Sequence, residues 1–270
     1  HPVQVRVKRT GAQTRARAGY WAANPAPAAP SSSARPGVLT LPFRPSHSSP
    51  YIRPWIGMSR SPSGLTSVTV TWEAGEAPPR NQRVASIAVK AIGPDGRVLF
   101  QDRMGPGDAS RATFDAPPGY IALEMAIQSS TGAALDTDYR GLSVPNLQAT
   151  RPTFATPQLL RTRTARHFAE VSANADAIPV ASRTFSRTER LLVRIPVYGP
   201  GDSTPEVTAT LLNRRGMAMR ELHRVPADLP PTIVQFDLPL SSLAPDEYRV
   251  ELTAANAQGP RDEARETLVF

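Results

Sequence analysis

Short runs of alternating apolar and polar residues recur along most of this chain. Val68, Val70 and Trp72 share one face of such a run, and Ile87 and Val89 share one face of another. A period of two residues is typical of a β-strand with one buried face. The sequence therefore predicts strands over residues 65–72, 85–92, 98–100, 112–114, 120–127, 135–144, 191–197, 207–211, 217–222, 233–240, 248–254 and 266–270.

Turn-forming residues separate these runs. Residues 93–96 (Gly-Pro-Asp-Gly) lie between two of the predicted strands and indicate a hairpin, and residues 213–216 (Asn-Arg-Arg-Gly) repeat this arrangement in the second half. The spacing of Ala165, Phe168 and Val171 is the one exception, and it predicts a short helix within residues 165–177.

The match between the two halves predicts the domain organisation. Regularly spaced short strands that occur twice indicate an all-β chain with two tandem antiparallel β-sandwiches of the immunoglobulin or fibronectin III type. We expect the sandwiches at residues 38–148 and 149–270, joined near residues 150–157. The predicted cores contain Leu65, Val68, Val70, Trp72, Ile87, Val89 and Phe114 in the first sandwich, and Leu191, Val193, Ile195, Val207, Leu211, Phe236 and Leu252 in the second.

The segment before the sandwiches has a different pattern. Residues 1–22 begin with a strand in which Val3, Val5 and Val7 share a face, and residues 23–37 form a linker rich in Pro, Ala and Ser. A lone apolar strand is a template for strand addition. We therefore expect Val3, Val5 and Val7, with Tyr20 and Trp21, to bind another polypeptide, either a partner subunit or the remainder of the chain's own precursor.

The composition limits the kinds of site and segment that this chain can contain. The hydrophobic content of 40% is enough for packed cores, and the absence of Cys excludes disulfides and thiolate metal sites. Because no run of about 18 apolar residues occurs, no membrane span is predicted. The chain starts at His1 without a signal-peptide pattern, so we interpret it as a processed or partial chain whose targeting segment lies upstream.

The net charge of +8 raises the question of nucleic-acid binding. Arginines account for nearly all of the positive charge, but they are dispersed in pairs such as Arg161 and Arg163. Alternate spacing of this kind is typical of the solvated face of a strand, whereas a nucleic-acid site would gather the charges in one stripe with exposed aromatic residues. No nucleic-acid partner is predicted.

Few residues of this sequence suggest a catalytic or metal-binding site. The four histidines, His1, His47, His167 and His223, have no metal-ligand spacing. His47 lies among serines, but the chain has no Gly-x-Ser-x-Gly motif, so we predict neither catalysis nor a cofactor. Residues 136–138 (Asp-Thr-Asp) resemble half of a calcium loop without its Gly and distal Glu, and we interpret them as a strand end without a metal.

Four aromatic residues allow more specific expectations. Tyr51 and Trp55 would form a carbohydrate-binding platform if both rings were exposed and coplanar, whereas buried rings would favour scaffolding. Tyr120 and Tyr248 each follow a Pro-containing turn, which predicts a structural corner where the Tyr packs and bonds to nearby backbone.

Several segments together show a resemblance to a known family. Residues 3–9, 15–21, 68–72, 93–96, 116–119 and 185–192 occur in an order that resembles the C-terminal region of bacterial VWFA-related proteins, secreted von Willebrand factor A domain-containing proteins common in Acidobacteria. The body of the A domain, with its metal-dependent adhesion site, is missing here, so no residue of this chain inherits that site. The resemblance implies export and protein binding.

These observations favour a non-catalytic protein-binding or scaffold module that acts through sandwich edges and loops. The resemblance implies that it is secreted, periplasmic or on the surface of a bacterium. The alternative is a carbohydrate-binding accessory module of a polysaccharide-degrading system. A third possibility, a cytoplasmic nucleic-acid binder, would require the arginines to lie in one stripe.

Overall fold

The structure is a computed structural model that describes residues 46–79, 82–148, 150–255 and 263–270. The predicted N-terminal strand and linker, including Val3, Val5, Val7, Tyr20 and Trp21, lie outside the described residues.

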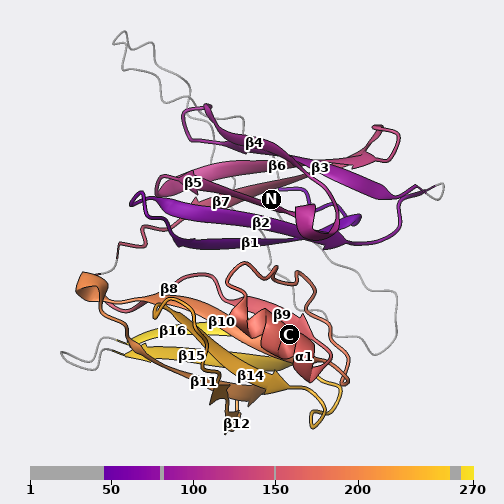
Figure 1. The fold of residues 1–270 in the computed structure, drawn as a ribbon. Helices are drawn as coiled ribbons and strands as arrows, with labels where there is room; N and C mark the ends of the chain where they lie inside the picture. Colours follow the sequence, from indigo (N-terminus) through magenta and orange to yellow (C-terminus); the bar gives the residue numbers. More distant parts are fainter. Residues whose placement is uncertain (1–45, 80–81, 149, 256–262) are drawn as a thin grey trace, which may run out of the picture. The chain divides into compact units, whose positions relative to one another are not determined.

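Residues 52–144 form a sandwich of two antiparallel sheets (Figure 1). The three-stranded sheet has the order β1-β2-β5, and the four-stranded sheet has the order β4-β3-β6-β7. The predicted hairpin at residues 93–96 is confirmed as the connection between β3 and β4. The strands are β1 (Ile52–Arg60), β2 (Thr66–Ala74), β3 (Val84–Ile92), β4 (Val98–Met104), β5 (Arg111–Ala116), β6 (Gly119–Ser129) and β7 (Ala134–Val144).

The inward faces of these sheets form one hydrophobic core. Six of the seven residues predicted for it are buried, from Val68 at 0% exposure to Phe114 at 7%. The prediction for Leu65 is wrong, because its side chain is 37% exposed. Leu65 lies in the turn before β2, where its carbonyl oxygen accepts a hydrogen bond from the Ser61 N–H. A turn residue leaves the alternation of the strand, so its side chain is not directed into the core.

Residues 153–269 form a second sandwich. One sheet has the order β13-β14-β10-β8, with β9 also paired to β10, and the other has the order β12-β11-β15-β16. Its strands are β8 (Thr153–Phe154), β9 (Gln158–Thr162), β10 (Arg190–Tyr198), β11 (Glu206–Asn213), β12 (Ala218–Glu221), β13 (His223–Arg224), β14 (Ile233–Pro239), β15 (Tyr248–Ala255) and β16 (Glu263–Val269). All seven residues predicted for this core are buried and belong to one cluster, separate from the first.

Four of the described strands escaped the sequence analysis: β1, β8, β9 and β13. In β9, Leu159 and Leu160 are adjacent and both buried, so the segment shows no alternation. In β1, the internal Pro54 and Gly57 and the adjacent apolar pair Trp55 and Ile56 hide the strand. Pro is tolerated there because β1 is an edge strand with only β2 as its partner.

The predicted helix is present but shorter than expected, with bounds Ala165–Ala173 (α1). Thr164 begins it, because its side-chain oxygen accepts a hydrogen bond from the His167 N–H at 3.1 Å. Among the helices described, none is long and apolar enough to cross a membrane.

Candidate functional site

A groove of about 620 Å³ lies at one end of the second sandwich. Three stretches of chain form it: the segment before β10, the turn between β14 and β15, and the C-terminal end of β16. Much of its lining is apolar. The lining residues are Arg183, Thr184, Phe185, Arg187, Leu240, Leu243, Ala244, Pro245, Asp246, Glu247, Tyr248, Val269 and Phe270.

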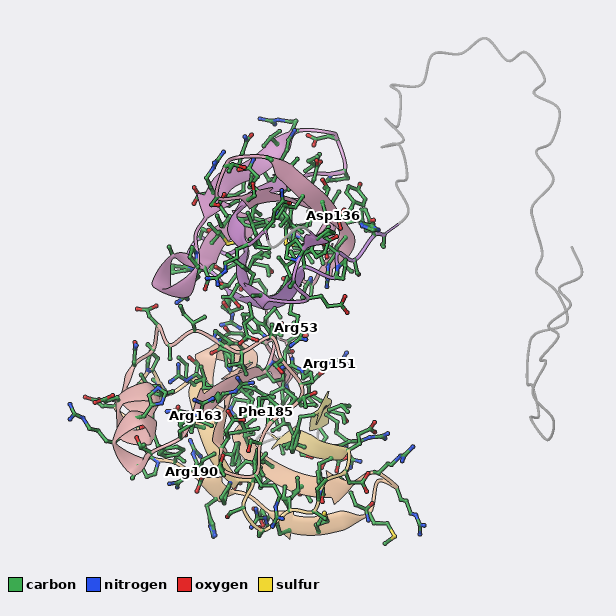
Figure 2. All side chains as sticks on the ribbon, turned by 90° about the vertical axis from the view of Figure 1, so that its right-hand side faces the viewer. Arg53, Asp136, Arg151, Arg163, Phe185 and Arg190 are labelled. Atoms are coloured by element: carbon green, nitrogen blue, oxygen red, sulfur yellow. The ribbon has the colours of Figure 1, made fainter. Side chains whose placement is uncertain are left out.

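Three aromatic rings form the apolar part of this groove. The Phe270 ring packs edge-on against Phe185, with centroids 6.3 Å apart, and stacks on Tyr248 at 6.1 Å. The guanidinium of Arg161 lies 5.1 Å from the centroid of the Phe185 ring. Phe185 and Phe270 remain partly exposed, whereas Tyr248 is 8% exposed. The groove therefore has one buried ring and two partly exposed rings, of which Phe185 is labelled in Figure 2.

Tyr248 fixes the turn on one side of the groove. Its hydroxyl donates to the Ala244 carbonyl oxygen at 2.9 Å, so the structural corner predicted for this tyrosine is confirmed. Tyr120 differs. It is 47% exposed and its ring lies across Gly141, at a position that any Cβ on residue 141 would occupy. The prediction of a packed corner at Tyr120 is therefore wrong, because the ring covers the sheet surface and is not buried in the core.

The lining of the groove contains charges of both signs. Arg183 and Arg187 come from the segment before β10, and the Arg187 guanidinium donates to the Ser241 carbonyl oxygen at 2.9 Å. Asp246 and Glu247 come from the turn before β15, where Glu247 is 3.2 Å from Arg249. Burial lowers the pKa of Arg183 from its ordinary value, and the charge on Glu73 opposes that shift.

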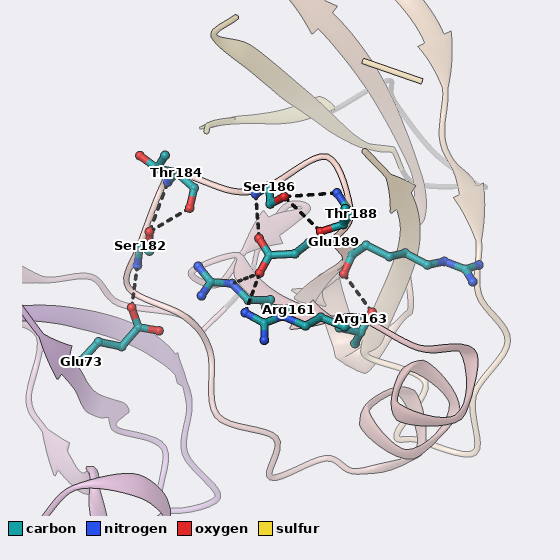
Figure 3. Close-up of polar contacts among 10 residues, drawn as sticks. Glu73, Arg161, Arg163, Ser182, Thr184, Ser186, Thr188 and Glu189 are labelled. Carbon is teal, nitrogen blue, oxygen red and sulfur yellow. Dashed lines mark hydrogen bonds and ion pairs between the residues drawn. The ribbon is translucent and has the colours of Figure 1, made fainter. Parts of the chain in front are cut away.

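A buried carboxylate holds the segment that carries Phe185 and Arg187. Glu189 is 6% exposed and accepts a hydrogen bond from the Ser186 N–H at 2.8 Å (Figure 3). Its other oxygen lies 3.4 Å from the guanidinium nitrogens of both Arg161 and Arg163. Because Arg161 also lies over Phe185, one network sets the position of the aromatic ring at the edge of the groove.

The same segment continues into a second ion pair. Arg190, the first residue of β10, binds Asp237 of β14 through two hydrogen bonds of 2.6 and 2.7 Å. Its guanidinium also lies 4.0 Å from the centroid of the Phe168 ring on α1. Residues 185–192, which the sequence analysis singled out only for their family resemblance, therefore anchor both the groove and the helix. In the sequence, the only sign of this network is that Glu189 lies between Arg187 and Arg190.

The structure brings His47 to Asp136, although they are far apart in the sequence. The His47 Nε2 atom is 3.3 Å from both carboxylate oxygens of Asp136 (labelled in Figure 2). The neighbouring Asp138 is fully buried and accepts hydrogen bonds from the Ser49 N–H and from Arg140. His47 also pairs with Tyr139 through two backbone hydrogen bonds, so these contacts hold the incoming chain against β7.

The carbohydrate platform expected at Tyr51 and Trp55 is not formed. Trp55 is 6% exposed, and its ring occupies the space above Gly57 where a side chain would lie. Tyr51 is only partly exposed. Trp55 lies in β1, where its ring packs along the sheet surface, so the two rings do not form a flat exposed surface.

Within the described ranges, no group of three or more His, Asp or Glu side chains is arranged to hold a metal ion. Asp136 and Asp138 each bind protein donors instead of sharing a site.

Comparisons with known proteins add only distant similarities. No family model and no curated protein matches the chain. Among solved structures, a tetra-tandem repeat from the extending region of a large adhesion protein is 12% identical, with a TM-score of 0.23; the match covers 81% of this chain but only 48% of the other. The fibronectin(III)-like modules of CbhA from Clostridium thermocellum are 11% identical over 76% of this chain and 84% of the other, with a TM-score of 0.23. A two-domain fibronectin type III segment of chicken tenascin is 9% identical, with a TM-score of 0.22; the match covers 80% of this chain and 99% of the other.

The sheets themselves define the class of protein. A three-stranded sheet of order β1-β2-β5 packed on a four-stranded sheet of order β4-β3-β6-β7 is a fibronectin III-like sandwich, and the second half repeats this core arrangement with β10-β14 opposite β12-β11-β15-β16. The chain is thus an all-β protein with tandem sandwiches of this type.

Proposed function

We propose that this protein is a non-catalytic, extracytoplasmic binding module, and that the groove at Phe185 holds an apolar side chain of a partner polypeptide. The observation that carries the proposal is the groove itself, whose lining combines two partly exposed aromatic rings with arginines and carboxylates. Aromatic and Arg residues are the side chains most enriched at the centres of protein interfaces.

The charges favour a polypeptide of a particular kind. In the groove lining, Arg183 and Arg187 complement an acidic residue of a partner, and Asp246 and Glu247 complement a basic one. The expected partner segment therefore has an apolar residue between an acidic and a basic residue. Export of the module is an expectation from the family resemblance, and cell fractionation of the source bacterium would test it.

The experiment is a selection of displayed random peptides on the full chain, followed by calorimetric titration of the enriched sequences. Enriched peptides should share the apolar residue with flanking charges. Their affinity should fall at least about tenfold for Phe185→Ala and for Arg187→Glu. Arg215→Glu is the matched control, because Arg215 is exposed and does not line the groove.

Two results would contradict the proposal. Enriched peptides that bind Phe185→Ala and Arg187→Glu as tightly as the unmodified chain would place the binding surface elsewhere. Binding to a glycan array that requires Phe185, with no enriched peptide, would favour a carbohydrate-binding accessory module. Thermal unfolding of each variant shows whether a loss of binding reflects the groove or the fold.

A further inference from the structure

The two edge strands of one sheet carry the same pair of charged residues. In the sheet β12-β11-β15-β16, β12 contains Arg220 and Glu221, and β16 contains Arg265 and Glu266. Each of these strands is hydrogen-bonded to only one neighbour among the described strands. The outer side of an edge strand presents unpaired N–H and C=O groups to which another strand can bind.

The strand β12 is unusually open for an edge. All four of its residues, Ala218–Glu221, are exposed, and Met217 and Met219 are 60% and 48% exposed. Exposed Met side chains are adaptable contact residues that recur at binding surfaces.

The register shows which charges share a face of the sheet. Arg220 lies opposite Leu211, and Glu266 lies opposite Leu252; both leucines are fully buried. Residues directly opposite each other have side chains on the same face, so Arg220 and Glu266 both belong to the inward face. The Arg220 side chain accordingly reaches the Pro239 carbonyl oxygen on the opposite sheet, at 3.3 Å.

The other two charges belong to the outward face. Glu221 lies opposite Thr210, and Arg265 lies opposite Thr253. Each face of the sheet therefore has an Arg at one edge and a Glu at the other, in opposite order on the two faces.

The strand directions make these edges compatible. All neighbouring strands in the sheet are antiparallel, so β12 and β16 run in opposite directions. A second copy placed beside the first in the same orientation would present its β16 antiparallel to β12. In the register that sets Arg220 opposite Glu266 of that copy, Glu221 falls opposite Arg265, because neighbouring residues step in opposite directions along the two strands.

We propose that β12 binds β16 of a second copy of this chain, which extends the sheet from one molecule into the next. Charges on edge strands ordinarily oppose such pairing, but here opposite charges meet on both faces. The contact is head-to-tail, so it joins successive molecules into open chains or rings. The ladder is short, which makes association weak in solution and stronger on a surface that holds many copies.

Sedimentation velocity of the full chain over micromolar to millimolar concentrations tests this inference through charge reversal. The unmodified chain should associate with increasing concentration. The single variants Arg220→Glu and Glu266→Arg should each stay monomeric, because each places like charges opposite one another at the junction. An equimolar mixture of the two variants should associate again, because both junctions in the mixture pair opposite charges. Arg215→Glu and Glu206→Arg, exposed reversals outside both strands, are the matched controls.

Three outcomes would overturn the inference: an unmodified chain that is monomeric at millimolar concentration, single variants that associate like the unmodified chain, or a mixture that remains monomeric. None of the four charged residues lines the groove at Phe185. Failure of self-association would therefore leave the proposed peptide binding intact, and failure of peptide binding would leave self-association intact.

Discussion

The guanidinium of Arg194 donates a hydrogen bond of 2.8 Å to the carbonyl oxygen of Val171. Arg194 lies in β10 and is 1% exposed, and it also bonds to the Ala175 carbonyl oxygen and to Gln235. These carbonyl groups lie in the last turn of α1 and just after it, where a helix has unpaired acceptors and a partial negative charge. A buried cation thus attaches the helix to the sheet.

Replacement of Arg194 should therefore release α1. We expect Arg194→Ala to lower the free energy of unfolding by about 2–3 kcal/mol, as for loss of hydrogen bonds to a charged group. Hydrogen exchange should show faster exchange in residues 165–173 than in the strands. Unchanged protection of the helix in a folded variant would show that other contacts hold it.

Burial has a second consequence for Arg194. It lowers the pKa of this side chain well below its ordinary value, to about 10. A base with a lowered pKa in the folded state costs stability while it is charged, and this cost disappears as the pH rises from about 10 towards the ordinary pKa of arginine. The stability difference between the unmodified chain and Arg194→Met should therefore grow in favour of the unmodified chain across that interval, as measured by urea unfolding. A difference that is constant with pH would exclude this linkage.

The core of the first sandwich can be probed with a matched pair of leucines. Leu123 is fully buried, whereas Leu65 is 37% exposed. We expect Leu123→Ala to cost about 2–5 kcal/mol of unfolding free energy. Leu65→Ala should cost less than about 1 kcal/mol. Chemical denaturation measures both values, and similar costs would show that Leu65 packs in the core.

Acid stability should depend on Asp115. Hydrogen bonds from Ser63 and Ser61, each 2.7 Å, lower the pKa of Asp115 below its ordinary value of 3.8. A carboxylate with a lowered pKa stabilises the fold above its ordinary pKa and loses that contribution as the pH falls through the folded value. The Ser61→Ala, Ser63→Ala double variant should therefore lose less stability below pH 3.8 than the unmodified chain loses, measured by urea unfolding at each pH.

Glu189 should contribute more to the stability of the fold than Arg163, its ion-pair partner. The Glu189 side chain is 5% exposed, and that of Arg163 is 73% exposed. Glu189→Ala should cost about 1–3 kcal/mol, because it leaves the Ser186 N–H without its acceptor and the buried Arg161 Nε without its ion-pair partner. Arg163→Ala should change stability by less than about 0.5 kcal/mol. Equal effects in thermal unfolding would refute this ranking.

The N-terminal residues allow a separate test. If Val3, Val5 and Val7 add a strand to another polypeptide, Val5→Asp should abolish that assembly while both sandwiches stay folded. Copurification of the partner subunit or precursor remainder measures the assembly, and circular dichroism monitors the sandwiches. Retained assembly would refute strand addition by this segment.

The sequence by itself determined the all-β class, the strands whose alternation is regular, and all but one of the predicted core residues. These features follow from a period-two pattern that a half-buried strand imposes on its own residues. The strand β9 escaped because both Leu159 and Leu160 are buried, and burial on two faces removes the alternation.

Which residues form the candidate site could be seen only in the tertiary structure. Phe185, Tyr248 and Phe270 are distant in the chain, and their rings meet because three separate segments end at the same side of the second sandwich. The burial of Trp55 and the exposure of Tyr120 were decided in the same way. A sequence pattern reports which face of a strand a side chain occupies, but whether that face is covered depends on what the rest of the chain packs against it.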